Sequence, residues 1–361
     1  MVKILGMTFC ELESWLVNEL HQKPFRAKQL FTWLHFRRVS SFDDMTDLSL
    51  KFRNTLKSAA EITLPGQVNK AESGDGTVKY LLQLPGGPAE SVLIPDPPRF
   101  TACLSTQYGC RMGCRFCMTG LAGFHGDMTV DEIVAQLYTM SGNSDRRISN
   151  VVLMGMGEPM DNWDAVQHAL EIISDDRGIC IGQRKITVST VGTPGGIRKL
   201  VDMEKQYGLA VSLHSAVQET REMIIPVAKA ISLPRLKHDM LEYTGTTGRR
   251  ATLEYCLIEG INDSLDEAKA LADFAKGLPC KINLLVYNQV PGLEWKPPTE
   301  ETVHRFTEYL YPRCQAVTLR RSRGGEVAGA CGQLGASVLN RTKENGTRQN
   351  RAPSRKPSIT D

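Results

Sequence analysis

From about residue 101 onward, short runs of apolar and β-branched residues alternate with longer stretches of helical periodicity. Repeated strand–helix units require a parallel sheet with helices on its outside. The sequence therefore predicts an α/β fold. Six or seven units favour a partial (βα)6-type or full barrel, with an open doubly wound sheet as the alternative. The predicted strands are 102–105, 151–154, 186–189, 209–213, 251–258, 282–286 and 317–319, and the predicted helices are 130–140, 163–173, 197–207, 265–276 and 301–310.

The segments on either side of this series have a different character. Leu12, Leu16 and Leu20 have helical spacing within residues 1–60, and the turn Gly74-Asp75-Gly76 predicts a small hairpin. Beyond about residue 336 the chain is rich in Arg, Lys, Asn, Ser and Pro and has few large apolar residues. We therefore expect an accessory helical and hairpin domain at 1–98, a barrel domain at 99–336 and a disordered basic tail at 337–361.

Composition and hydropathy exclude several classes of protein. No uncharged apolar run approaches the roughly 18–20 residues of a membrane span, and the first residues lack the apolar region of a secretory signal. These features predict a cytoplasmic protein without a membrane segment. The ten cysteines would then be more typical of metal ligands or reactive thiols than of a disulfide framework. The net charge of +3 gives no argument for nucleic acid, so such an argument must rest on local patches.

Three cysteines lie close together after the first predicted strand of the series. Cys110, Cys114 and Cys117 have the spacing C-x3-C-x2-C, in a loop at the carboxyl end of that strand, where βα barrels carry their chemistry. A structural zinc site commonly uses four ligands, and the nearest histidine is His125. Three thiolates fit better an iron–sulfur cluster that leaves one iron open to a substrate or cofactor. A zinc loop and a chance cluster of cysteines are the alternatives.

This cysteine motif resembles the signature of the radical S-adenosylmethionine (SAM) enzymes, which bind a [4Fe-4S] cluster in a partial βα barrel. Further motifs, from about residue 20 to 336 and in the family's order, resemble the RlmN/Cfr branch, which methylates adenine in RNA. Two segments depart from the family pattern: 226–229 lacks an asparagine after its prolines, and 325–327 replaces an acidic-hydrophobic pair. The matching motifs are Cys103-Leu-Ser-Thr-Gln-Tyr-Gly-Cys110, Met154-Gly-Met-Gly-Glu158-Pro159, Ser212-Leu-His214, Gly260-Ile-Asn-Asp263 and Ala330-Cys331-Gly-Gln-Leu334.

Within the branch, Gly157-Glu158-Pro159 and Arg320-Arg-Ser-Arg323-Gly324 are more similar to RlmN, the adenine C2 methyltransferases, than to Cfr, the C8 enzymes. The resemblance implies a [4Fe-4S] cluster on Cys110, Cys114 and Cys117, and two SAM molecules for each methylation. The residues that it implies for SAM binding are Gly157, Glu158, Ser189, Ser212, Leu213, His214 and Asn288.

The resemblance also implies three catalytic residues. Cys331 would carry the methyl group as a methyl-cysteine, and Cys103 would close a transient disulfide onto Cys331 to release the methylated base. Glu90 would be the general base that removes the proton from the attacked carbon. Without the resemblance, both cysteines would be interpreted as packing residues and Glu90 as a solvated charge at a strand edge.

Three segments concentrate basic residues and lack Asp and Glu: 21–38, 99–126 and 309–325. The first interleaves its basic residues with aromatic ones, and the other two flank the cysteine motif and the loop of Cys331. A charge run is usually a solvated face, yet arginine at such places suits RNA phosphates. We expect 23S rRNA and tRNA as substrates, an electron donor such as flavodoxin or ferredoxin, and a monomer.

Three alternative functions stay open at this point. The first is a Cfr-like C8 methyltransferase, and the second is a radical SAM enzyme with a substrate other than RNA. The third is an RNA-binding protein that has a zinc loop and no enzymatic activity.

Overall fold

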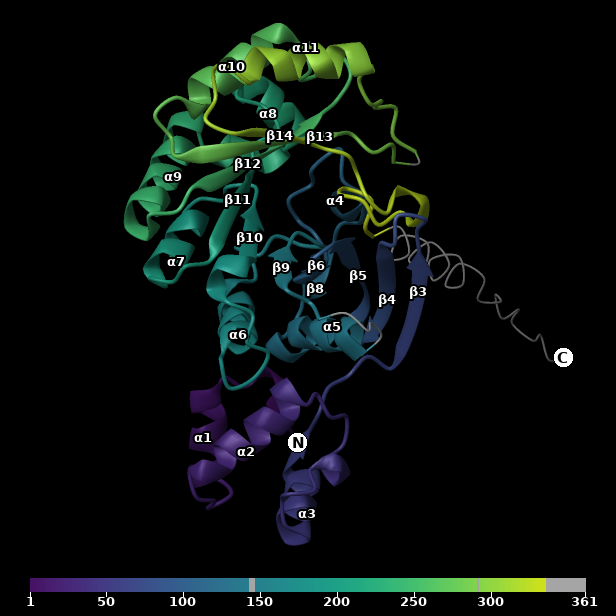
Figure 1. The fold of residues 1–361 in the computed structure, drawn as a ribbon, viewed down its shortest axis with the longest axis vertical. Coiled ribbons are helices and arrows are strands. Elements are labelled where there is room, and N and C mark those ends of the chain that lie inside the picture. Colours follow the sequence, from purple (N-terminus) through teal and green to yellow (C-terminus); the bar gives the residue numbers. More distant parts are fainter. Residues whose placement is uncertain (143–146, 291, 336–361) are drawn as a thin grey trace, which may run out of the picture.

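The computed structural model describes residues 1–142, 147–290 and 292–335, so the predicted basic tail at 337–361 lies outside the described residues. Its centre is a ten-stranded sheet in the order β14-β13-β12-β11-β10-β9-β6-β5-β4-β3 (Figure 1). The seven strands from β6 to β14 in this sheet are all parallel to their neighbours. They are β6 (Arg99–Cys103), β9 (Asn150–Leu153), β10 (Ile186–Thr190), β11 (Gly208–Ser212), β12 (Ala251–Leu257), β13 (Cys280–Val286) and β14 (Val317–Arg320).

Helices connect these parallel strands and lie along the outside of the curved sheet (Figure 1). Several begin at a hydroxyl that accepts a backbone N–H, as Ser232, Ser264 and Thr299 do. All five predicted helices are present, although the third ends five residues earlier than expected. The connecting helices are α5 (Val130–Gly142), α6 (Trp163–Ser174), α7 (Gly196–Asp202), α8 (Gln218–Ile224), α9 (Leu233–Thr247), α10 (Leu265–Ala275) and α11 (Glu300–Leu310).

The predicted hairpin is present and extends the main sheet. Strands β3 (Gln67–Glu72), β4 (Val78–Leu84) and β5 (Gly87–Asp96) pair in antiparallel fashion, and β5 pairs with β6. Because β3 and β14 stand at opposite ends of the strand order, the sheet is open, and its curvature in Figure 1 makes it a partial barrel. The division at residue 98 stays a prediction, since the strands on either side of it are neighbours.

The N-terminal helices have a buried apolar cluster of their own, which includes Leu12, Leu30 and Leu56. These helices are α1 (Phe9–Asn18), α2 (Phe25–Phe31) and α3 (Leu50–Ala59). They lie together at the end of the molecule farthest from α10 and α11 (Figure 1). Among the described residues, no helix is long and apolar enough to cross a membrane.

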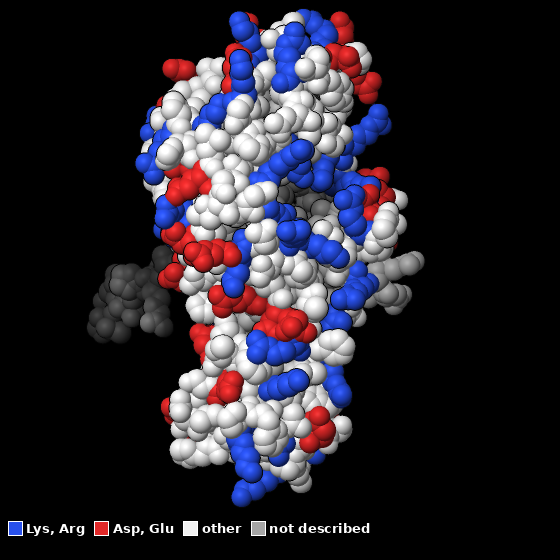
Figure 2. Space-filling view, turned by 60° about the vertical axis from the view of Figure 1, so that its left-hand side comes forward, with Lys and Arg blue, Asp and Glu red and all other residues white. Residues whose placement is uncertain are grey.

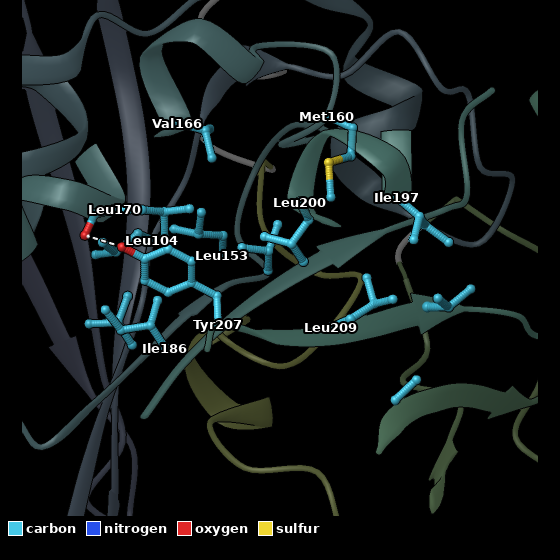
Figure 3. Close-up of a cluster of buried hydrophobic side chains, with 14 of the residues drawn as sticks. Leu104, Leu153, Met160, Val166, Leu170, Ile186, Ile197, Leu200, Tyr207 and Leu209 are labelled. Carbon is cyan, nitrogen blue, oxygen red and sulfur yellow. Dashed lines mark hydrogen bonds between the residues drawn. The ribbon is translucent and has the colours of Figure 1, made fainter. Parts of the chain in front are cut away.

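The main core lies between the sheet and the outer helices, and part of it is drawn in Figure 3. Leu153, Ile186 and Leu209 come from three neighbouring strands and pack against α6 and α7. Tyr207 lies among them, and its hydroxyl donates to the carbonyl of Leu170 at 3.1 Å. Each Å² of apolar surface buried here contributes about 25 cal/mol to the free energy of folding. Because the strands and helices share this core, the strand ends that carry the site are held in fixed positions.

Candidate active site

A cavity opens at the carboxyl ends of β9 to β13, beside the cysteine loop. Its wall contains most of the residues that the sequence singled out: Cys110, Cys114, Cys117, Gly157, Glu158, Ser189, Ser212, His214, Asn288 and Cys331. These residues come from six separate parts of the chain. The predicted SAM residue Leu213 is buried behind the wall, and Glu90 and Cys103 lie outside the lining.

The cysteine loop leaves β7 (Gln107–Gly109) and ends at α4 (Met118–Ala122). Gly113 has a φ of +66°, and the N–H of Cys117 donates to the carbonyl of Cys114 at 3.1 Å. This tight turn brings all three thiols to one cavity wall. The loop is tied to α8 by the N–H of Arg115, which donates to the carbonyl of Ile224 at 3.0 Å.

The three thiols fit an iron–sulfur cluster by their chemistry. Burial raises the pKa of Cys110 to about 12 and raises that of Cys114 well above its usual value, and neighbouring thiol charges add to both shifts. Without a metal such thiols stay protonated at neutral pH, and bound iron would favour their thiolate form. Among the described residues, no three His, Cys, Asp or Glu side chains are placed to hold a single metal ion.

Glu158 lies at the end of β9, in a turn that requires glycine. A Cβ on Gly157 would come within 2.7 Å of Gln107, and its φ of +103° is strained for any other residue. The carboxylate of Glu158 accepts the N–H of Val191 at 2.9 Å and that of Met160 at 3.2 Å. Burial still raises the pKa of Glu158 to about 7, so this carboxyl group would gain from a cationic partner.

His214 follows β11 and is held rigidly. Its φ of +56° is unusual for a residue with a side chain, and its Nδ1 accepts the backbone N–H of Cys256 at 3.0 Å. Burial, reinforced by the charge of Arg221, lowers the pKa of His214 to about 3. The ring is therefore neutral with its proton on Nε2, and it packs edge-on against Phe116 of the cysteine loop.

Cys331 lies in a loop that returns to the same cavity after β14. The carbonyl of Cys331 accepts a hydrogen bond from Asn288 at 3.2 Å, and the next carbonyl, of Gly332, accepts the N–H of Met118 at 2.8 Å. Cys331 is exposed, yet the surrounding protein and the charge of Glu254 raise the pKa of its thiol to about 11. The carrier loop, which we define as residues 324–335, thus joins the cysteine loop to the end of β13.

Cys103 and Glu90 contact the carrier loop from strands β6 and β5, outside the cavity lining. Cys103 is buried at the end of β6 in a small apolar cluster with Leu334. Burial, followed by the charge of Cys331, raises the pKa of Cys103 to about 12. Glu90 is fully buried in β5, where its Oε2 accepts the N–H of Gly335 at 2.9 Å and lies 3.6 Å from Lys79 Nζ. The prediction of a solvated Glu90 in the absence of the family resemblance is wrong.

Sequence reasoning missed three further residues at this site. Glu254 and Cys256 line the cavity from β12, and Arg221 is buried in α8. Asn283 donates to Glu254 at 2.6 Å, while burial raises the pKa of that carboxyl group. The signal that the sequence offered was Glu254, a charged residue within the largely apolar strand 251–258.

Arginine side chains surround the approach to this site. Exposed arginines lie in the cysteine loop, at Arg111 and Arg115, and between β14 and Cys331, at Arg320, Arg321 and Arg323. Figure 2 shows Lys and Arg gathered around a hollow on one face of the molecule. Separately, the N-terminal helices expose Phe25 and Phe36 beside the basic residues of segment 21–38. The surface around the hollow has the charge expected of one that contacts a polyanion.

The chain is similar in sequence to known RNA methyltransferases and to the radical SAM superfamily. Residues 2–62 match the ribosomal RNA large subunit methyltransferase N-terminal domain, and residues 104–272 match the radical SAM superfamily. The dual-specificity RNA methyltransferase RlmN of Nitratidesulfovibrio vulgaris is 40% identical over 351 residues, covering 94% of this chain and 95% of its own length. That of Magnetococcus marinus is 38% identical over 345 residues, covering 94% and 96%.

A solved structure agrees with these matches. The crystal structure of a radical SAM methyltransferase from Sphaerobacter thermophilus superimposes with a TM-score of 0.89 and is 36% identical in sequence. The match covers 93% of this chain and 100% of that one.

Proposed function

Because this chain belongs to the RlmN family of radical SAM RNA methyltransferases, we propose that it methylates carbon 2 of adenine in 23S rRNA and in tRNA. The observation that carries this proposal is the meeting of three sets of residues at one cavity: the cysteine motif, the SAM residues and Cys331. The family membership confirms the predicted enzyme class and the radical SAM fold. The base position, the choice of RNA and the individual roles below belong to the proposal.

The superfamily implies a [4Fe-4S] cluster and SAM. We assign the cluster to Cys110, Cys114 and Cys117, and the SAM ammonium group to Glu158. Ser189, Ser212, His214 and Asn288 would contact the rest of SAM from the ends of three strands, β10, β11 and β13, with Leu213 supporting this wall. When bound, the cluster and SAM supply a 5′-deoxyadenosyl radical that abstracts hydrogen from a methyl group.

Cys331 is the proposed methyl carrier because its thiol faces the cavity from the carrier loop. Methyl uptake requires the thiolate, and the high pKa of Cys331 means that its proton must be removed at that step. The hydrogen bond from Asn288 to the Cys331 carbonyl supports a fixed position for this sulfur.

Cys103 and Glu90 are the proposed residues of product release. Cys103 packs with Leu334 of the carrier loop, and the charge of Cys331 adds to the burial that raises the pKa of Cys103, which supports a transient disulfide between the two cysteines. The bond from Gly335 to Glu90 supports a base close to the carrier loop. In this scheme Glu90 takes the proton from the attacked adenine carbon, after which Cys103 attacks the Cys331 sulfur.

RNA would approach across the arginine-rich surface around the cavity. Arg111, Arg115 and Arg320 are exposed and would contact phosphates, and the N-terminal aromatics would add contacts to bases. An adenine within a stack must leave it to reach Cys331. The electron donor, such as flavodoxin or ferredoxin, and the monomeric state stay predictions.

Analysis of RNA from cells with and without this gene tests the proposal. We expect 2-methyladenosine at one site of 23S rRNA and in tRNA of cells with the gene, and its loss from cells without it. Nucleoside mass spectrometry of the separated RNAs makes this measurement, and return of the wild-type gene is the control. 8-Methyladenosine would instead favour the Cfr-like function, and unchanged RNA would contradict methylation of either kind.

We expect Glu158→Gln to weaken SAM binding roughly tenfold or more, because a charge-assisted hydrogen bond contributes about 1.5–3 kcal/mol. The change keeps the size of the side chain but removes its negative charge. Anaerobic calorimetry of the cluster-loaded protein measures the dissociation constant. Glu219→Gln, at an exposed position on α8, is the matched control and leaves the affinity unchanged. An unaltered affinity in Glu158→Gln would remove Glu158 from the SAM site.

A further inference from the structure

Arg221 is a buried cation that the reaction scheme above does not use. It is in α8 and is fully buried. Its Nη2 donates to the carbonyl of Val191 at 2.5 Å, but its Nε and Nη1 have no hydrogen-bond partner among the described residues. Two unsatisfied donors on a buried guanidinium carry a large desolvation cost, so a compensating group is expected nearby.

The surroundings of Arg221 point to the cysteine loop. Burial lowers the pKa of Arg221 to about 10, so it stays charged at neutral pH, and the charges of Cys114 and then Glu222 oppose this shift. No carboxylate of the described residues forms an ion pair with Arg221 within 4.0 Å. The N–H of Arg115, next to Cys114, also bonds to α8 through Ile224. Helix α8 thus brings one buried positive charge towards one thiol of the cysteine motif.

Arg221 is also linked to the proposed SAM pocket, through the backbone of Val191. Both backbone groups of Val191 are hydrogen-bonded. Its N–H donates to Glu158, and its carbonyl accepts from Arg221. The charge of Arg221 also disfavours protonation of His214. Arg221 therefore lies at the junction of the cysteine loop, the end of β10 and the end of β11.

We propose that Arg221 is the counter-charge of the cluster at Cys114 and a positioning residue for the cysteine loop. The inference rests on the proposed function, because it takes the cluster to be bound by Cys110, Cys114 and Cys117. The net charge around a cluster and the hydrogen bonds to its sulfurs set its reduction potential. A buried cation at Cys114 makes electron uptake by the cluster more favourable.

Replacement of Arg221 by methionine tests this inference. Arg221→Met keeps much of the side-chain volume and removes the charge, while Arg221→Lys keeps the charge and removes the fork of donors. Anaerobic redox titration, followed by electron paramagnetic resonance of the reduced cluster, is the measurement. At a fixed potential we expect the ratio of reduced to oxidised cluster to fall about tenfold in Arg221→Met, which corresponds to about 59 mV for a one-electron couple.

Arg221→Lys should lie between Arg221→Met and wild type. Arg305→Met, which removes an exposed arginine from α11, is the control and keeps the wild-type potential. A folded Arg221→Met protein that takes up the cluster at the wild-type potential contradicts the inference. Wild-type protein that binds no cluster contradicts the proposed function instead.

Thermal unfolding of the cluster-free proteins shows that the variants are folded. Without the cluster, Arg221→Met should unfold at the same temperature as wild type or higher, because it lacks an uncompensated buried charge. Cluster loading should then raise the unfolding temperature of wild type by more than that of Arg221→Met. An equal increase in both proteins contradicts the assignment of Arg221 as counter-charge.

Discussion

Alanine in place of Cys110, Cys114 or Cys117 is expected to give a folded protein with no [4Fe-4S] cluster and no methylation of RNA. Each substitution removes one of three thiolates and leaves an iron without its protein ligand. The three side chains line a cavity wall and lie outside the main apolar core, so the sheet should still form. Iron and sulfide analysis, visible absorption and SAM cleavage after anaerobic reconstitution are the measurements.

Cys10→Ala is the matched control for these variants. Cys10 is exposed on α1, away from the cysteine motif, and its loss should change neither iron content nor turnover. Full iron occupancy with normal turnover in any one of the three motif variants would contradict the cluster assignment. A colourless wild-type protein that contains stoichiometric zinc after anaerobic purification would favour the zinc alternative.

The parallel strands were predictable because each one is a short apolar run between helices of different periodicity. All seven occur within about three residues of their expected ends. The sequence analysis did not predict α8 and α9. Helix α9 contains Pro234 and Gly245, which weaken a helical pattern, yet Pro234 stands in the first turn, where proline is tolerated.

The metal-binding motif of the site could be predicted from the sequence, whereas the contacts between distant segments and the buried charge could not. The close spacing of Cys110, Cys114 and Cys117 restricts them to one loop, whatever the tertiary fold. The approach of Cys103 to Cys331 depends on how the carrier loop packs on β6, and no local pattern specifies that. Arg221 looks like an ordinary helix arginine until its burial and its two unsatisfied donors are known.

The unequal roles proposed for Cys103 and Cys331 lead to the second prediction. Cys331→Ala removes the sulfur that carries the methyl group, so it should methylate no RNA and form no covalent complex with it. Cys103→Ala keeps that sulfur but lacks the thiol that resolves the adduct. Cys103 is buried and lies in one apolar cluster with Leu334, which brings it next to the loop that holds Cys331. We therefore expect Cys103→Ala to accumulate RNA bound through Cys331.

The resolution step accounts for this difference atom by atom. The Cys103 thiolate attacks the Cys331 sulfur, a disulfide forms, and the bond from that sulfur to the adduct carbon breaks. The electron pair of the broken bond stays with the carbon, which takes up a proton and becomes the methyl group. Without Cys103 the carbon–sulfur bond persists. Glu90→Ala should also trap RNA, because the adenine proton would stay on the adduct.

A nuclease-sensitive shift of the purified protein in a denaturing gel detects the adduct, and mass spectrometry locates it on the peptide with Cys331. Cys103→Ala/Cys331→Ala is the decisive control, since trapping requires the carrier sulfur and the double variant should trap nothing. A Cys103→Ala protein that traps no RNA and keeps its turnover would make Cys103 a packing residue. Methylation by Cys331→Ala would be the more serious result, because no scheme with a methyl-cysteine carrier survives it, whatever cluster the protein binds.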